Sequence, residues 1–202
     1  MFFKRHKIIK KFGPIKSPVK LTICDYHSTT LDSFFEQFKE INEVSIVQGD
    51  ITKFKCDAII TVGNSFGDMG GGVDKAIDDS FGGEAQKIVQ SIIAEDFFGE
   101  LPVGSSFYVF PEEKRPALIY APSMRIPGQL SNTINPYLAL RTALIVAIQN
   151  NFEHIVCPAL GCGVGGVDPK DAAEQMLTAF AVIAFNRWKD IIHPAQAPYA
   201  LR

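Results

Sequence analysis

The residues best suited to chemistry lie in one glycine-rich stretch, residues 63–74, with the sequence GNSFGDMGGGVD. It holds five glycines in twelve positions and follows an apolar segment, residues 58–62, that is predicted to be a buried strand. Glycine destabilises regular elements, so this density indicates a backbone that another molecule approaches closely. Successive amides leading into a helix form a cradle for an anion such as a diphosphate. A carboxylate would repel phosphate, so Asp74 must face another part of the ligand, and Asn64 stands at the other end of the stretch.

A second glycine-rich loop, residues 161–166, lies between another apolar segment and a helix that begins near Pro169. Its glycines Gly161, Gly163 and Gly166 match the G-x-G-x-x-G spacing of dinucleotide-binding folds. That fold requires a further strand with an acidic residue after the helix, and here only a short tail follows. Neither loop ends in Gly-Lys-Ser/Thr, which argues against a P-loop nucleotide hydrolase. Two separate glycine loops instead favour a ligand whose diphosphate is held from both sides.

Three further side chains have both a functional and a structural interpretation. Asp50 follows a predicted strand, where it can close a turn or accept a hydrogen bond from an adenine amino group. Asp68 is either a solvated loop acid or a second carboxylate near the reacting centre. Cys162 lies among amides that would lower the pKa of a thiol. No histidine stands at a recognisable spacing to act as its base, so we expect Cys162 to fill a crowded loop.

The cysteines provide no metal-binding pattern. The four cysteines are far apart and none forms a C-x-x-C pair, which argues against a zinc ribbon or a disulfide framework. Free cysteines of this kind suit a reducing cytosol. We therefore expect a cytoplasmic protein that needs neither a metal nor another cofactor.

Length and composition indicate one globular domain. The chain has 202 residues, of which 47% are hydrophobic and 21% charged, and it contains no apolar run long enough to cross a membrane. Seven lysine and arginine residues fall within the first twenty positions, before any acid. Residues 1–18 are therefore predicted to form a basic arm, either solvated or loosely docked, or else a transit or phosphate-binding segment. The remainder of the chain is acidic, which argues against general nucleic-acid binding.

Predicted strands and helices alternate along the chain, which indicates an α/β fold with a largely parallel sheet covered on both faces. The predicted strands are residues 19–25, 44–47, 58–62, 105–110, 117–121 and 154–159. The helix that opens near residue 28 has an apolar face formed by Leu31, Phe34, Phe35, Phe38 and Ile41. Asn135 and Asp168 each precede a proline and are predicted to cap helices.

The candidate residues all follow predicted strands. Asp50, the 63–74 loop, a turn at residues 122–124 and the 161–166 loop each come directly after one. Ligands of such sheets bind at the carboxyl ends of the strands. We therefore expect these four segments to converge on one crevice.

Four motifs, agreeing in order and spacing, resemble those of the macro domain family. They are Gly49-Asp50-Ile51-Thr52; Asp57-Ala58-Ile59-Ile60 followed by Asn64 and Gly70-Gly71-Gly72-Val73-Asp74; Ala121-Pro122-Ser123-Met124; and the run from Pro158 to Gly166. The resemblance covers residues 19–185 and leaves 186–202 as a tail. It implies a three-layer α-β-α fold with a mixed, largely parallel central sheet. The stretch from Ser65 to Met69 is similar to a divergent bacterial and viral subgroup.

The resemblance also implies a ligand, ADP-ribose or a related small nucleotide, and a role for each residue. Asp50 would contact the adenine amino group, with the Ile51 amide nearby. Asn64 would bind the distal ribose, and Asp74 would position or activate an attacking water. The diphosphate would be held by the two loops, through Gly70, Gly71, Gly72, Val73, Gly161, Cys162, Gly163, Val164 and Gly165.

Two positions depart from the family pattern. Thr61 stands where the family usually has an asparagine, and Gly165 or Val164 stands where it has an aromatic residue over the distal ribose. The retained pair, Asn64 and Asp74, favours an enzyme that hydrolyses a bond at the distal ribose.

Three classes of protein fit these motifs. The enzyme's substrate would be an O-acetyl ester, a 1″-phosphate or a mono-ADP-ribosyl ester, which makes an ADP-ribosylated protein a candidate partner. The alternatives are a non-catalytic module that binds ADP-ribose or an NAD metabolite, and a structural protein with a vestigial pocket. No membrane or specific nucleic acid is expected as a partner.

Overall fold

The computed structural model describes residues 18–113, 116–190 and 193. The predicted basic arm therefore lies outside the described residues except for Pro18, and so does most of the predicted tail. Within the described part, six strands form one sheet in the order β2-β1-β6-β3-β5-β4. The strands are β1 (Lys20–Asp25), β2 (Val44–Gln48), β3 (Ala58–Thr61), β4 (Phe107–Val109), β5 (Ala117–Tyr120) and β6 (His154–Cys157).

All neighbouring strands pair in parallel except β4, which runs antiparallel to β5. This confirms the predicted α/β fold with a mixed, largely parallel sheet. The helices are α2 (Ser28–Phe38), α3 (Gly72–Ser80), α4 (Ala85–Asp96), α5 (Asn135–Gln149) and α6 (Pro169–Ala184), with short 3-10 helices η1 (Ile51–Lys53) and η2 (Arg187–Asp190). None of the helices in the described ranges is long and apolar enough to cross a membrane.

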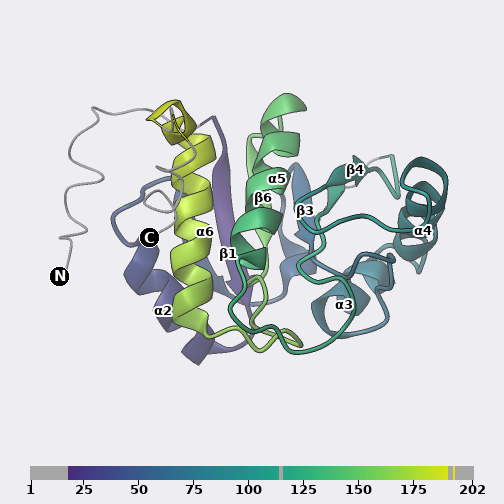
Figure 1. The fold of residues 1–202 in the computed structure, drawn as a ribbon, viewed down its shortest axis with the longest axis horizontal. Helices are drawn as coiled ribbons and strands as arrows, with labels where there is room; N and C mark the ends of the chain where they lie inside the picture. The colour runs from purple at the N-terminus through teal and green to yellow at the C-terminus, as the bar shows by residue number, and fades with distance from the viewer. Residues whose placement is uncertain (1–17, 114–115, 191–192, 194–202) are drawn as a thin grey trace.

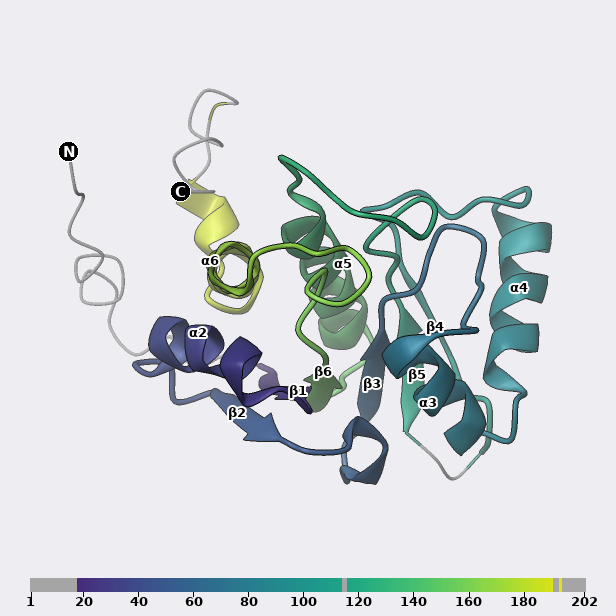
Figure 2. The same cartoon turned by 90° about the horizontal axis from the view of Figure 1, so that it is seen from below.

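The helices form two layers, one on each face of the sheet (Figures 1 and 2). Helices α2, α5 and α6 cover one face, and α3 and α4 cover the other. Successive strand residues point to opposite faces, so Ile60 of β3 packs in the first apolar cluster and its neighbour Ile59 in the second. Burial on both faces explains why β3 reads as a continuous apolar run.

Two predicted helix caps have different outcomes. Asp168 caps α6 as predicted, because its carboxylate accepts hydrogen bonds from the amides of Lys170 and Asp171. The prediction for Asn135 was wrong. Asn135 is the first residue of α5, and its side-chain amide donates to the carbonyl of Ser123, 2.8 Å away. That bond ties the start of α5 to the loop after β5.

Helix α2 provides a matched test of core packing. Phe34 is fully buried and stacks with Phe38, whereas its neighbour Phe35 is 58% exposed. We expect Phe34→Ala to lower the free energy of unfolding by about 3–5 kcal/mol, because it leaves a cavity under the sheet. Phe35→Ala serves as the control and should change it by no more than about 0.5 kcal/mol. Urea unfolding followed by circular dichroism measures both, and equal losses would contradict the assigned helix face.

Candidate functional site

The four segments predicted to converge do meet at the carboxyl edge of the sheet. The strands β3 and β6 are direct neighbours, so the loops that follow them start side by side. Asn64 forms an isolated parallel bridge with Met124, which joins the first glycine loop to the segment after β5. The amide of Leu130 donates to the carbonyl of Gly165 at 2.8 Å and ties the same segment to the second glycine loop. Helix η1, which follows Asp50, contacts α3.

Side chains hold the first glycine loop in shape. The side-chain oxygen of Asn64 accepts from the amide of Phe66 at 3.0 Å, and its nitrogen donates to the carbonyl of Asp68 at 3.1 Å. The Tyr120 hydroxyl rises from β5 and donates to the Asn64 carbonyl at 2.7 Å. A Cβ on Gly63 would lie 2.4 Å from that hydroxyl oxygen, so the close approach of Tyr120 requires glycine there. Asn64 is thus buried and organises the loop that surrounds it.

The structure supports the structural interpretation of Asp68, the acid within this loop. Its carboxylate accepts from the amide of Gly70 at 2.9 Å, and the residue is exposed. The next amide, that of Met69, donates to the side chain of Gln86 on α4. Asp68 therefore turns the chain toward α3, and its charge also acts on Asp74.

Two groups of backbone amides have no acceptor in the described part of the chain. The first consists of the amides of Gly71, Gly72, Val73 and Asp74 at the start of α3. The second consists of the amides of Gly163 and Val164 in the loop after β6. Helix starts leave such donors unpaired, and a concave group of them attracts anions. The glycines of both groups are exposed, so a ligand can reach them.

Asp74 lies in the first turn of α3 and is partly buried. Its Oδ1 accepts from the hydroxyl of Thr61 and from the amide of Val62, the latter at 3.1 Å. Its Oδ2 accepts no hydrogen bond from the described residues and is not fully enclosed. Burial raises the pKa of Asp74, against the opposing effect of these two hydrogen bonds, and the nearby charge of Asp68 raises it further.

After the edge strand β2, Asp50 caps η1, which agrees with its structural interpretation. Its Oδ1 accepts from the hydroxyl and the amide of Thr52, at 2.7 and 2.9 Å, and these bonds lower the pKa of Asp50. The nearby hydroxyl of Tyr26 contributes to the same lowering of the Asp50 pKa. Ile51 is buried, and its amide has no acceptor in the described chain. The Ile51 amide is thus the unpaired donor next to the Asp50 carboxylate.

In the second glycine loop, the pKa of Cys162 differs from the expectation. Burial raises the pKa of Cys162 to about 12, so its thiol stays protonated at neutral pH. The prediction that surrounding amides would lower this pKa was wrong, because burial and the charges of Asp25 and Asp168 all raise it. Gly161 has a positive φ of 78°, and a Cβ on Gly165 would lie 2.6 Å from the Gly161 carbonyl oxygen. Position 165 therefore cannot carry the aromatic side chain of the family pattern in this loop conformation, and Val164 stands exposed beside it.

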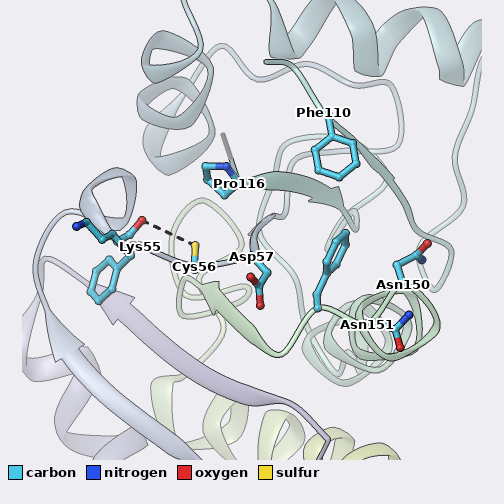
Figure 3. Close-up of a pocket in the computed structure, with 9 residues that line it drawn as sticks. Lys55, Cys56, Asp57, Phe110, Pro116, Asn150 and Asn151 are labelled. Atoms are coloured by element: carbon cyan, nitrogen blue, oxygen red, sulfur yellow. Dashed lines mark hydrogen bonds between the residues drawn. The ribbon is translucent and has the colours of Figure 1, made fainter. Parts of the chain in front are cut away.

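A groove at the opposite, amino-terminal edge of the sheet was not predicted (Figure 3). Its lining includes Asp57, Cys56, Phe110 and Asn151. The Asp57 carboxylate accepts from two amides at the start of β6, both at 2.8 Å, so it is already engaged. Burial raises the pKa of Cys56 to about 11, which keeps that thiol protonated. The groove therefore has less reactive chemistry than the carboxyl edge.

Sequence reasoning missed two residues that shape the site. Thr61 was noted only as a departure from a family pattern, yet it is the hydroxyl partner of Asp74. Tyr120 was interpreted only as part of a strand, yet it supports the Asn64 carbonyl. Both stand at the last position of a strand, Thr61 in β3 and Tyr120 in β5, which is the local signal that could have identified them.

A sequence profile of the Macro domain family matches residues 62–176, more than half of the chain. The chain belongs to the Macro domain family. An uncharacterized protein of Aquifex aeolicus is 34% identical over 136 residues, which cover 67% of this chain and 79% of that protein. A protein of Escherichia fergusonii named O-acetyl-ADP-ribose deacetylase is 30% identical over 136 residues, covering 66% of this chain and 75% of that protein.

Solved structures agree with this assignment. A mutant of the Oceanobacillus iheyensis macrodomain with ADPR superposes with a TM-score of 0.58 at 26% identity. The match covers 65% of this chain and 72% of the Oceanobacillus chain. The three-layer architecture expected from the macro domain motifs is therefore confirmed.

The crowding at position 165 is testable with a second glycine of the same loop. We expect Gly165→Ala to lower the free energy of unfolding by about 1–3 kcal/mol, because the new Cβ meets a backbone carbonyl that cannot move aside. Gly163→Ala is the control, since a Cβ there would have no heavy atom within 4 Å. Thermal unfolding compares the two variants. A Gly165→Ala protein as stable as Gly163→Ala would show that the loop adopts another conformation.

Proposed function

We propose that this macro domain binds ADP-ribose or a close derivative in the crevice at the carboxyl edge of the sheet. The proposal rests on two sets of backbone amides that have no acceptor among the described residues. One set lies at the start of α3 and the other in the loop after β6. Two sets of donors that follow the neighbouring strands β3 and β6 suit a diphosphate, which has acceptor oxygens on both phosphorus atoms. The Oceanobacillus relative with ADPR supports the same ligand class.

The placement of the rest of the ligand follows from the strand order, in which Asp50 follows β2 and the two glycine loops follow β6 and β3. The adenine would lie toward Asp50 and Ile51, where a carboxylate stands next to an unpaired amide donor. The distal ribose would lie toward Asn64 and Asp74, beyond the diphosphate. Asn64 still has one side-chain N–H to donate, because only its other N–H is used by the Asp68 carbonyl.

The proposed reaction is hydrolysis at the distal ribose. In an acyl ester, a water oxygen would bond to the acyl carbon and the ester C–O bond would break. The Oδ2 atom of Asp74 would accept the proton of the water, and that proton would then pass to the released ribose oxygen. The raised pKa of Asp74 makes its carboxylate a stronger base than an ordinary aspartate. An O-acetyl ester, a 1″-phosphate and a mono-ADP-ribosyl ester on a protein are the candidate substrates, and the name of the Escherichia fergusonii relative supports the first.

A binding module without catalysis is the second candidate. The observation that favours it is Gly165, because no side chain can stand there to pack over the distal ribose. A ribose that is held less firmly would react more slowly, since rate depends on the fraction of time in the reactive geometry. Both candidates share the same ligand and differ only in what Asp74 does.

Calorimetric titration tests the shared ligand. We expect ADP-ribose to bind at least about tenfold more tightly than AMP, because AMP lacks the second phosphate and the distal ribose. NAD serves as a further comparator, since it carries the diphosphate with a different group on the distal ribose. Equal affinities for ADP-ribose and AMP, or no binding of either, would contradict the proposed diphosphate cradle.

The Asp74→Asn variant separates the enzyme from the binding module. If Asp74 acts on water, we expect turnover of O-acetyl-ADP-ribose to fall by roughly 10²–10⁴-fold, while ADP-ribose affinity changes little. Asp79→Asn is the matched control, because Asp79 lies on the same helix but is exposed and paired with Lys75. Undiminished turnover in Asp74→Asn would remove Asp74 from the reaction. A wild-type protein that binds ADP-ribose and hydrolyses none of the three candidate substrates would be a binding module.

A further inference from the structure

We propose that Thr61 is the positioning residue for Asp74: it holds one carboxylate oxygen and leaves the other free to act on the substrate. This inference rests on the proposed function, because it explains how the carboxylate of Asp74 is held for the proposed reaction. It also gives a role to the residue that departs from the usual asparagine of the family.

The contacts of the two carboxylate oxygens differ. Thr61 is the last residue of β3 and is fully buried. Its hydroxyl donates to Oδ1 of Asp74, and the next amide, that of Val62, donates to the same atom at 3.1 Å. Oδ2 accepts no hydrogen bond in the described chain and is not fully enclosed. Because both contacts come from the rigid end of a central strand, they fix the direction in which Oδ2 points.

The hydroxyl also opposes the groups that disfavour a negative charge on Asp74. Burial and the charge of Asp68 both raise the pKa of Asp74. Burial, together with the charge of Asp74, raises the pKa of the Tyr120 phenol on β5, so Tyr120 stays neutral. Among the described residues, Thr61 and Val62 are the groups that stabilise the ionised carboxylate, and only the Thr61 contact comes from a side chain.

Packing alone does not require a hydroxyl at this position. Valine has nearly the same shape as threonine and is equally suited to a buried strand. A Thr61→Val variant therefore removes the donor while it keeps the volume, and Thr61→Ser restores the donor without the methyl group. Thr22→Val is the matched control. Thr22 is a buried strand threonine of the same sheet, and its hydroxyl pairs with His154 at 2.9 Å and makes no contact with Asp74.

The first readout is the pKa of the Asp74 carboxyl group, followed by carbon-13 NMR as pH is varied. The missing resonance in Asp74→Asn assigns the signal. The hydroxyl favours the ionised form, so its loss should raise the pKa of Asp74 in Thr61→Val. The value should return toward that of the wild type in Thr61→Ser and stay unchanged in Thr22→Val. This readout needs no substrate.

The second readout is the pH dependence of turnover. An ionised Asp74 is the active form, so activity falls as the pH drops through its pKa. A raised pKa in Thr61→Val should therefore move this acidic limb to higher pH, and kcat at the wild-type optimum should fall by roughly tenfold. The KM should change little, because the diphosphate is held by backbone amides elsewhere.

The outcomes separate this inference from the proposed function. An unchanged Asp74 pKa in a folded Thr61→Val protein would overturn the positioning role, even if the wild type is an active hydrolase. A wild type without turnover would reject the hydrolysis, and the NMR titration would still decide whether Thr61 holds Asp74. Thr61→Ala carries the same test if Thr61→Val does not fold. If neither variant folds while Thr22→Val does, Thr61 has a structural role and the proposal fails.

Discussion

The structure of the carboxyl edge of the sheet depends on one constraint: the two glycine-rich loops must keep their shape while several of their backbone amides stay unpaired. A loop whose amides stay available to a ligand cannot be ordered by the backbone hydrogen bonds that order a helix or a strand. Beyond the backbone bridge that joins Asn64 to Met124, side chains order the loop. Asn64 bonds to the Phe66 amide and the Asp68 carbonyl, Asp68 bonds to the Gly70 amide, and Tyr120 holds the Asn64 carbonyl. The loop keeps its shape while its last amides, from Gly71 to Asp74, remain free in the described chain.

The sheet makes this arrangement rigid. Strands β3 and β6 are central, and apolar clusters cover them on both faces. Irregular backbone with unpaired amides would be costly inside those clusters, so it gathers where the strands end and water is near. The polar residues that act on the loops, Thr61 and Tyr120, stand at the last positions of their strands for the same reason. They are anchored by the core and still contact Asp74 and Asn64 at the carboxyl edge.

The surroundings of Asp74 have opposing effects on the stability of its negative charge. Its place in the first turn of α3 favours a negative charge, since a helix start carries partial positive charge. Burial and Asp68 disfavour that charge, and the Thr61 hydroxyl and Val62 amide oppose them. A carboxylate in this balance keeps one oxygen fixed and holds its proton at a higher pH than an exposed aspartate does. Both properties suit a group that takes a proton from water next to a bound sugar.

The sequence by itself determined the alternation of strands and helices, the two glycine loops and the Asp168 cap, because periodicity, glycine density and capping are local properties. Only the tertiary structure decided the strand order, the antiparallel β4 and the contacts between distant segments. Asn135 bonds to Ser123 instead of capping its own helix, and burial keeps the Cys162 thiol protonated despite the amides around it. The pairing of Thr61 with Asp74 and the crowding at Gly165 likewise arise where segments meet. A local pattern cannot specify such contacts, because each depends on which parts of the chain the folded sheet brings together.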